Sequence, residues 1–117
     1  YGGAATPLPI LAAAAALWRD EEHVRENRTL YRAKLDMAER LLGGRFGFVR
    51  PAGGFFLWLD VGAGETAALV RWCRANLRVL PGKYLSRGGV GDRYIRVALV
   101  HDLETTERAL TRLAQTL

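Results

Sequence analysis

The chain has 117 residues and a mass of 13.0 kDa, which is the size of one modest domain. Because 50% of the residues are hydrophobic and 25% are charged, the composition excludes a disordered chain. No apolar run approaches the roughly 18 residues that a membrane-spanning helix needs, and no secretory signal opens the sequence, so we expect a soluble protein. The single cysteine, Cys73, excludes a disulfide framework and favours a reducing compartment, for which we expect the cytoplasm. The sequence opens on Tyr1 rather than Met, which suggests a piece of a longer protein.

A formal net charge of +5 and an isoelectric point near 10.0 raise the question of nucleic-acid binding. The distribution of the charges argues against it, because the basic residues are scattered among acids, as in the segment 19–22, and no run of five like charges exists. We therefore expect no nucleic-acid partner, with a small basic nucleic-acid-binding domain as a remote alternative.

Two helices are predicted in the first 42 residues. Thr6 is a candidate cap in front of Pro7 and Pro9, and the alanine-rich residues 10–18 follow it. An alanine-rich face gives little core of its own, so we expect this helix to pack on a larger body that these 117 residues do not contain. Residues 20–42 are predicted to form a long amphipathic helix, which Asp20 caps and Gly43 ends.

Strands and helices alternate in the rest of the chain. Residues 46–49 and 55–59 are rich in aromatic residues, and the turn formers at 50–54 between them predict an antiparallel hairpin. The second strand is apolar at every position, so we expect it to be central in its sheet. A helix at 65–76, strands at 77–80 and 94–100, and a final helix that begins at Asp102 complete the chain. This order predicts an α/β protein of the α+β two-layer sandwich type, with helices packed on one face of a small mixed sheet.

Arg96 is the candidate binding residue, because it interrupts a strand that is otherwise apolar from 95 to 100. The pattern alone favours an arginine that extends to water or pairs with a surface acid, as on a strand with one wet face. Alternatively, the strand presents a forked guanidinium to a ligand carboxylate, which would bind it through two parallel hydrogen bonds. Both interpretations stay open at this point.

The other reactive side chains do not make up a catalytic set or a metal site. His23 and His101 are far apart in the sequence and are expected on the surface or at caps. Cys73 is predicted to pack in the core. Lys34 is expected on the charged face of the long helix and Lys83 after a turn, and neither has a desolvating pocket that would activate its amine.

Four segments in a fixed order carry a resemblance to a known family. They are Thr6-Pro7-Leu8-Pro9-Ile10, Pro51-Ala-Gly-Gly-Phe-Phe-Leu-Trp-Leu59, Val79-Leu-Pro-Gly82 and Tyr94-Ile-Arg-Val-Ala-Leu99. Together they resemble the C-terminal region of class I/II aminotransferases, which are pyridoxal-phosphate enzymes of the fold type I superfamily of aspartate aminotransferase. The run 5–17, the Phe-Gly-Phe of 46–48 and the segment 97–102 look most like bacterial N-succinyldiaminopimelate aminotransferases.

The resemblance implies a role for each part of the chain. Residues 1–19 would belong to the large domain of the parent enzyme, and residues 20–117 would form the small C-terminal domain that closes over the substrate. Arg96 matches the arginine that binds the substrate α-carboxylate in this family, so the resemblance favours the second interpretation of that residue. The loop at 1–6 is implied to lie near the interface of a homodimer, where Thr6 would reach toward the partner subunit's active site.

The catalytic lysine of the family lies upstream of the matched region, and Lys34 and Lys83 do not match it. The resemblance therefore implies a parent enzyme of amino-acid biosynthesis that uses pyridoxal 5'-phosphate. It would transfer an amino group from an amino acid, with N-succinyl-diaminopimelate as a candidate, to 2-oxoglutarate. The chain alone is expected to hold no cofactor, to contain no catalytic residue and to be inactive. The alternative is an inactive stand-alone binding or regulatory domain of the same descent.

Overall fold

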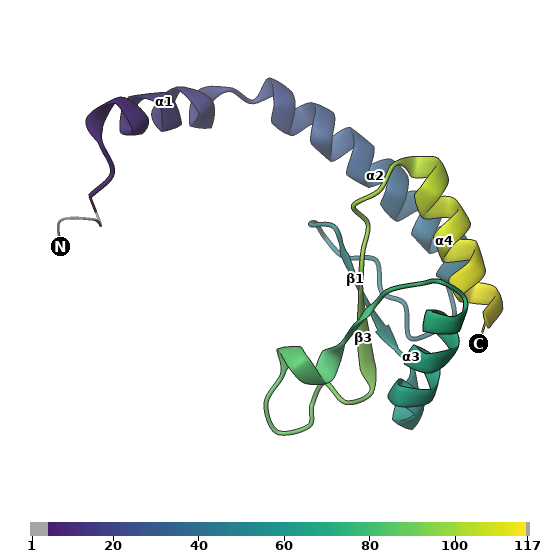
Figure 1. The fold of residues 1–117 in the computed structure, drawn as a ribbon. Helices are drawn as coiled ribbons and strands as arrows, with labels where there is room; N and C mark the ends of the chain where they lie inside the picture. Colours follow the sequence, from purple (N-terminus) through teal and green to yellow (C-terminus); the bar gives the residue numbers. More distant parts are fainter. Residues whose placement is uncertain (1–4, 117) are drawn as a thin grey trace.

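The computed structural model describes residues 5–116, and Figure 1 shows their fold. The α-helices are α1 (Leu8–Arg19), α2 (Glu22–Leu42), α3 (Glu65–Arg74) and α4 (Leu103–Thr116). The strands are β1 (Phe56–Asp60), β2 (Leu80–Pro81) and β3 (Tyr94–Ala98). Two short 3-10 helices, η1 (Gly62–Gly64) and η2 (Gly82–Leu85), lie in the connections.

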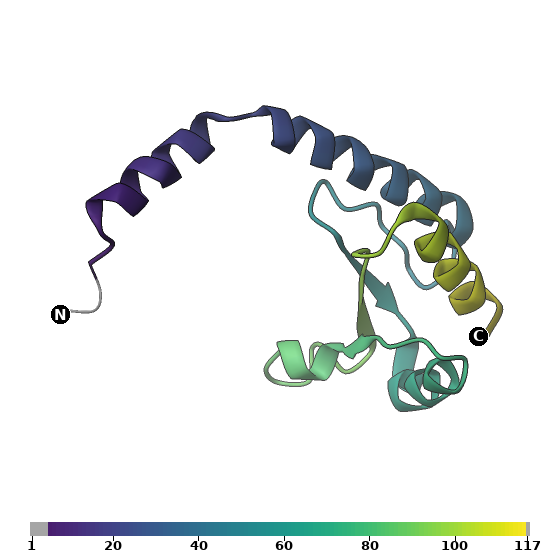
Figure 2. The same ribbon diagram turned by 45° about the horizontal axis from the view of Figure 1, so that its top comes forward.

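The three strands form one sheet in the order β1-β3-β2, and both pairings are antiparallel. Helices α2 and α4 lie side by side and cover one face of the sheet, and α3 packs beside α4 (Figures 1 and 2). This arrangement confirms the predicted fold class, a small sheet with helices on one face. The prediction of a mixed sheet is wrong for the described strands, because both of their pairings are antiparallel. Strands β1 and β2 run in the same direction, but β3 lies between them.

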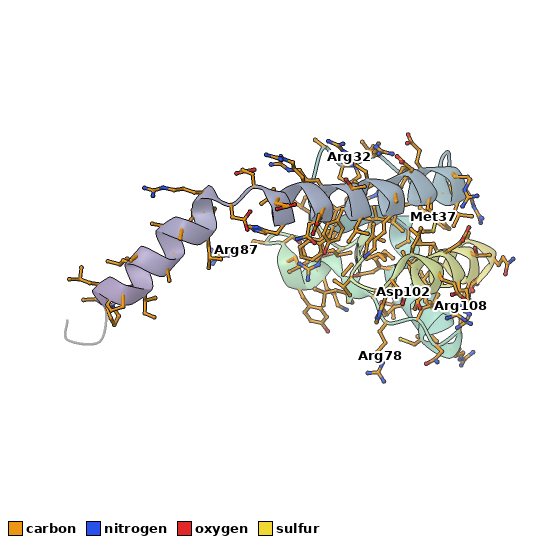
Figure 3. All side chains as sticks on the ribbon, turned by 90° about the horizontal axis from the view of Figure 1, so that it is seen from above. Arg32, Met37, Arg78, Arg87, Asp102 and Arg108 are labelled. Carbon is orange, nitrogen blue, oxygen red and sulfur yellow. The ribbon has the colours of Figure 1, made fainter. Side chains whose placement is uncertain are left out.

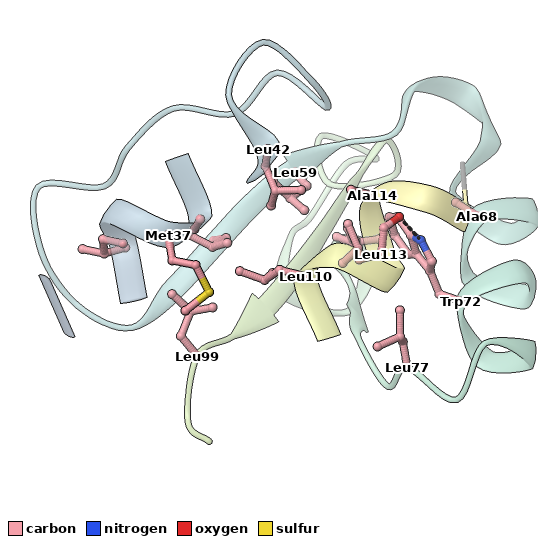
Figure 4. Packing of buried hydrophobic residues seen from close by; sticks show 14 residues of the cluster. Met37, Leu42, Leu59, Ala68, Trp72, Leu77, Leu99, Leu110, Leu113 and Ala114 are labelled. Carbon is pink, nitrogen blue, oxygen red and sulfur yellow. Dashed lines mark hydrogen bonds between the residues drawn. The ribbon is translucent and has the colours of Figure 1, made fainter. Parts of the chain in front are cut away.

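The hydrophobic core lies between this sheet and the helices (Figure 4). Side chains alternate along a strand, so Leu57, Leu59 and Ile95 share the face that the helices cover, and all three are buried. Helix α3 contributes Trp72, which is 0% exposed. The indole Nε1 of Trp72 donates a hydrogen bond to the carbonyl of Leu113 at 3.2 Å, the dashed line in Figure 4, so its polar atom is satisfied inside the core.

The strand predicted at 46–49 is wrong, because this segment forms a turn. Phe46 and Gly47 have φ angles of 52° and 56°, in the left-handed region that a strand does not use. The carbonyl of Phe46 accepts a hydrogen bond from the N–H of Asp60 at 2.7 Å, which joins the turn to the end of β1. The Phe46 ring meets Trp72 edge-on, with 6.1 Å between ring centroids. The aromatic residues of this segment therefore indicate core packing rather than a strand.

Strand β1 is an edge strand rather than the central strand that its apolar sequence predicted. Leu57 and Leu59 are buried, but Phe56 and Trp58, which alternate with them, are 38% and 50% exposed. In this chain the helices cover one face of β1, and the other face is left open. The apolar residues on that open face lie next to Arg96, as described below.

Helix α1 adds nothing to the core, because none of its residues is buried. It extends away from the sheet in Figure 1, as expected of a helix whose packing partner lies outside this chain. The division into residues 1–19 and 20–117 stays a prediction. The predicted Thr6 cap is wrong, because Pro7 occupies the cap position and no side chain bonds to the first turn. Residues 1–4 of the loop predicted near a dimer interface lie outside the described residues, and the contact predicted for Thr6 stays a prediction.

The predicted start of α2 is displaced by one residue, because Glu21 and not Asp20 is the N-cap residue. The carboxylate of Asp20 still accepts a hydrogen bond from the N–H of Glu22 at 3.0 Å. The predicted ends of α2 and α3 are confirmed. Gly43 is the C-cap residue of α2. Asn76 follows α3 with a φ angle of 61°, in the left-handed conformation that commonly ends a helix.

Asp102 begins α4 as predicted, and this cap leads to a test of pH dependence. The N–H of Thr105 donates a hydrogen bond to the Asp102 carboxylate at 2.8 Å, and this bond lowers the pKa of that carboxyl from its ordinary value of 3.8. A lowered folded-state pKa stabilises the fold above the unfolded-state pKa, and this stabilisation is lost as the pH falls through the folded-state value. Asp102→Asn keeps an oxygen acceptor that does not titrate. We therefore expect urea unfolding to show a smaller loss of stability between pH 7 and about pH 2 in this variant than in the wild type. Equal losses in the two proteins would contradict the assignment.

Candidate functional site

The open face of the sheet gathers three aromatic side chains around one arginine. Strand alternation places Arg96 on the face opposite Ile95, and in the register of the sheet Arg96 is paired with Trp58 of β1 and Leu80 of β2. We call Phe56, Trp58, Tyr94 and Arg96 the aromatic face. Along each strand, the residues of the aromatic face alternate with the buried residues of the core. The packing of the core therefore fixes the position of the aromatic face.

The guanidinium of Arg96 lies over an aromatic ring. Its Cζ is 4.3 Å from the centroid of Phe56, a cation–π contact of about 0.5–1 kcal/mol where water has partial access. A ring contact of this kind uses none of the five N–H donors of an arginine. Among the described residues, 5–116, no carboxylate lies within ion-pair distance of Arg96. The interpretation as an arginine that pairs with a surface acid is therefore not supported.

Arg93, three residues earlier, shows how an arginine here binds a carboxylate. Its Nε lies 2.9 Å from one carboxylate oxygen of Asp60, and a terminal nitrogen lies 2.6 Å from the other. These hydrogen bonds lower the pKa of Asp60 below its ordinary value. Arg96 has the same fork, but within the described part of the chain it has no such partner. The geometry therefore leaves Arg96 able to bind a carboxylate that comes from elsewhere.

Further aromatic residues extend this arrangement toward helix α2. The rings of Trp58 and Tyr94 lie 6.0 Å apart, those of Phe55 and Phe56 lie 4.2 Å apart, and Tyr31 of α2 stacks on Phe55 at 5.8 Å. Sequence reasoning missed Phe56 and Trp58 as neighbours of Arg96. The signal that points to them is alternation, because every second residue of an all-apolar edge strand must face away from the core.

The two glycines before β1 form a turn, as the sequence predicted. Gly54 has a φ angle of 80°, which favours glycine at this position. The turn lines a cleft of about 380 Å³. Residues of α2, among them Arg28, Tyr31 and Arg32, line the other side of this cleft. A side chain at Gly53 or Gly54 would meet nothing within 4 Å, so the positive φ angle and not a close approach accounts for the glycine at 54.

Lys34 is buried, which corrects its predicted place on the charged face of α2. It is 9% exposed, its Nζ donates a hydrogen bond to the carbonyl of Leu99 at 3.0 Å, and the same nitrogen lies 5.0 Å from the centroid of Tyr31. Helical periodicity misses this burial because the acceptor comes from a segment 65 residues away. Lys83 is exposed and lies over the ring of Tyr84 at 5.4 Å.

Three other sequence predictions concern residues away from the aromatic face. Cys73 is exposed, so its predicted core position is wrong: Trp72 takes the inward direction of α3, and the next residue is turned by about 100°. His23 pairs with Asp20 at 3.3 Å on the surface, and the side chain of His101 is exposed, as expected. Within residues 5–116, no three His, Cys, Asp or Glu side chains come together in a way that could hold a metal ion.

The labelled arginines are distributed unevenly. Figure 3 shows Arg32 and Arg87 apart from Arg78 and Arg108, and the last two line one cavity together with Arg112. Other arginines pair with carboxylates, as Arg50 does with Asp36 and Glu39. The absence of a nucleic-acid partner stays a prediction. No helix among the described residues has the length and apolar character required to cross a bilayer.

Comparison with known proteins relates the chain to aminotransferases. No family model matches the chain. It is 30% identical over 114 residues to the 4-dedimethylamino-4-oxo-anhydrotetracycline transaminase OxyQ of Streptomyces rimosus, a match that covers 97% of this chain and 31% of that protein. The crystal structure of an aminotransferase from Neisseria meningitidis is similar with a TM-score of 0.87 at 36% identity, over 98% of this chain and 31% of that one. A probable N-succinyldiaminopimelate aminotransferase from Thermus thermophilus is similar with a TM-score of 0.76 at 26% identity, over 88% of this chain and 28% of that one.

The chain thus spans about a third of the length of the relatives that it matches. The helices and the three-stranded sheet described above match the C-terminal domains of this group, including a Thermus thermophilus aspartate aminotransferase variant at a TM-score of 0.68 and 27% identity. The chain therefore has the aspartate-aminotransferase-like fold of a C-terminal domain, and the proteins that it resembles in both sequence and structure are aminotransferases.

Proposed function

We propose that this chain is the C-terminal part of a pyridoxal-phosphate-dependent aminotransferase and that Arg96 binds the α-carboxylate of its substrates. The observation that carries the proposal is the guanidinium of Arg96, which lies over Phe56 without an ion-pair partner among residues 5–116. The likeness of the chain to aminotransferases in sequence and fold supports the reaction class. Amino acids and 2-oxo acids, the two substrates of an amino transfer, share a planar carboxylate that fits a forked arginine.

The binding of a carboxylate by Arg96 would hold the substrate in one orientation. Two parallel N–H···O bonds fix the plane of the carboxylate, which in turn fixes the direction of the bonds at the neighbouring carbon. Phe56 and Trp58 are 38% and 50% exposed in this chain, so an ion pair at Arg96 would strengthen only when the rest of the enzyme covers the aromatic face. If the domain moves toward the rest of the enzyme on binding, the closure would depend on the presence of a substrate carboxylate.

The lysines of this chain do not fit the role of the residue that holds the cofactor. The amine of Lys34 is buried and bonded to the Leu99 carbonyl, and Lys83 lies exposed in the short helix η2. We therefore propose that pyridoxal 5'-phosphate, which supplies the electron sink for amino transfer, is held by residues outside this sequence. The remaining partners belong to the same proposal: the rest of the aminotransferase chain, a second copy in a homodimer that Thr6 contacts, and 2-oxoglutarate as the amino acceptor.

The identity of the amino donor is a finer part of the proposal. N-succinyl-diaminopimelate is our candidate, and it is supported by the likeness to the Thermus thermophilus protein at 26% identity. The match to the transaminase from Streptomyces rimosus shows that related proteins also act on other compounds. A donor screen with the full-length protein, in which 2-oxoglutarate accepts the amino group, separates these candidates. Activity with unrelated donors only would contradict the choice of donor and leave the reaction class intact.

Because the cofactor is proposed to be held outside this sequence, the absorption spectra of the 117-residue chain and of the full-length protein are expected to differ. The 117-residue chain is expected to show no lysine-dependent absorption band at about 420 nm when it is mixed with pyridoxal 5'-phosphate. The full-length protein is expected to show this band. Borohydride reduction followed by mass spectrometry then identifies any lysine that carries the cofactor. A stable adduct on Lys34 or Lys83 would contradict the proposal. A full-length protein without the band or amino transfer would favour an inactive binding or regulatory domain.

A further inference from the structure

Helix α2 contains a buried cation without a buried anion beside it. Lys34 is 9% exposed, and its Nζ has the Leu99 carbonyl at 3.0 Å and the face of Tyr31 at 5.0 Å as its neighbours. No carboxylate in the described part of the chain lies within ion-pair distance of it. Burial of a charged group costs free energy that a neutral carbonyl only partly offsets, and an apolar side chain would fill the same space at lower cost. The cost of burying Lys34 therefore indicates that its hydrogen bond to the Leu99 carbonyl has a structural role.

The acceptor of this bond lies where β3 leaves the sheet. Leu99 directly follows the strand that carries Arg96, and its N–H donates a hydrogen bond to the carbonyl of Phe55 at 2.8 Å. Its own carbonyl accepts the hydrogen bond from Lys34. Because Leu99 is buried, water has little access to replace a lost donor at this carbonyl. Lys34 thus fixes the end of β3 to helix α2.

The same helix also contacts Phe55, the neighbour of the ring beneath Arg96. Tyr31, one turn before Lys34, stacks on Phe55 at 5.8 Å, and Phe55 contacts Phe56 at 4.2 Å. Phe56 is the ring over which the Arg96 guanidinium lies. Helix α2 therefore fixes two things: the backbone of the strand that carries Arg96, and the aromatic surface on which its side chain rests.

We propose that Lys34 is a positioning residue for substrate binding: through its hydrogen bond to the Leu99 carbonyl, it sets the place of the Arg96 guanidinium over Phe56. This inference rests on the proposed binding of the substrate carboxylate by Arg96. Lys34 itself contacts no substrate. Its removal shifts the end of β3 and the guanidinium with it, and a misplacement on the order of 1 Å can cost up to about 100-fold in rate.

The test uses the full-length enzyme and a double-mutant cycle. Lys34→Met replaces the cation with an apolar side chain of similar length, and we expect kcat/KM for the amino donor to fall about tenfold, mainly through a higher KM. The matched control is Lys83→Met, at an exposed position of η2, which is expected to leave kcat/KM unchanged. In the background of Arg96→Met, Lys34→Met is expected to cause little further loss, because Lys34 acts through Arg96.

Each outcome decides between specific alternatives. Equal losses from Lys34→Met in the presence and absence of Arg96 would mean that Lys34 acts only on general stability, which overturns the inference. Lys34→Arg keeps a cationic donor and is expected to restore most of kcat/KM, so an Arg variant that folds but is as impaired as the Met variant also contradicts it. If Lys34→Met does not fold, as judged by circular dichroism, Lys34→Gln takes its place in the cycle and the same two outcomes apply. If Arg96→Met alone leaves kcat/KM unchanged, the proposed function fails, whatever the results at Lys34.

Discussion

Replacement of Arg96 by Lys in the full-length enzyme is expected to lower kcat/KM for the amino donor by about 100-fold, although the positive charge is kept. The reason is geometric. A guanidinium presents paired N–H donors to both oxygens of a carboxylate, whereas an ammonium presents one point charge that permits rotation of the bound group. Lysine also loses the flat contact with Phe56 that holds Arg96 at 4.3 Å. Initial rates over a range of donor concentrations measure the effect.

A matched control separates this loss from a general effect of Arg-to-Lys changes. Arg40 of α2 is exposed and pairs with Glu107 of α4, and Arg40→Lys is expected to leave kcat/KM within about twofold of the wild type. A comparison of acid and amide substrates adds a second readout, because the amide lacks the charge that Arg96 would bind. The preference for the acid is expected to shrink in Arg96→Lys. An unchanged kcat/KM and an unchanged preference would together rule out Arg96 as the carboxylate-binding residue.

The helices, and the order of the elements apart from the strand expected at 46–49, could be predicted from the sequence because they depend on local patterns. The periodicity of 20–42 gives α2, and Asp102 followed by spaced leucines gives α4. The turn at Phe46 and Gly47 could not be predicted in this way, because aromatic residues favour strands, and here the Phe46 ring packs on Trp72 from a turn. The placement of Lys34 also depended on distant partners, because only the folded chain brings the Leu99 carbonyl to α2.

The candidate site was predicted only in part for the same reason. Arg96 stands out in the sequence as a charge within an apolar strand, and the family resemblance gave it a role. Its surroundings depend on register: Trp58 lies opposite Arg96, and Phe56 lies opposite Ala98, only because β1 pairs with β3 in this alignment. A shift of one residue would turn these aromatic side chains to the other face of the sheet. Both strands bury one face in the same core, and this packing fixes the register, which the pattern within one strand does not reveal.

The largest expected effect on stability is at Trp72, the largest of the fully buried side chains. Trp72→Ala is expected to lower the free energy of unfolding by about 3–5 kcal/mol, because it removes a large buried ring and leaves a cavity. The change also removes the edge-on contact with Phe46, at 6.1 Å, and leaves the Leu113 carbonyl without its donor. Urea unfolding of the 117-residue chain, followed by far-UV circular dichroism, measures the difference.

Trp58 supplies the matched control, because it is the same side chain on the open face of the sheet. It is 50% exposed, so Trp58→Ala is expected to cost about 1 kcal/mol or less in the isolated chain. Trp72→Phe gives an intermediate step: a ring still fills most of the space, and the loss of the Nε1 hydrogen bond accounts for about 1–3 kcal/mol. If the Ala variants at 58 and 72 were equally destabilised, Trp58 would contribute as much to the packing of the domain as Trp72 does. The aromatic face would then be part of the packing that holds the domain together, and no longer a surface free to bind substrate.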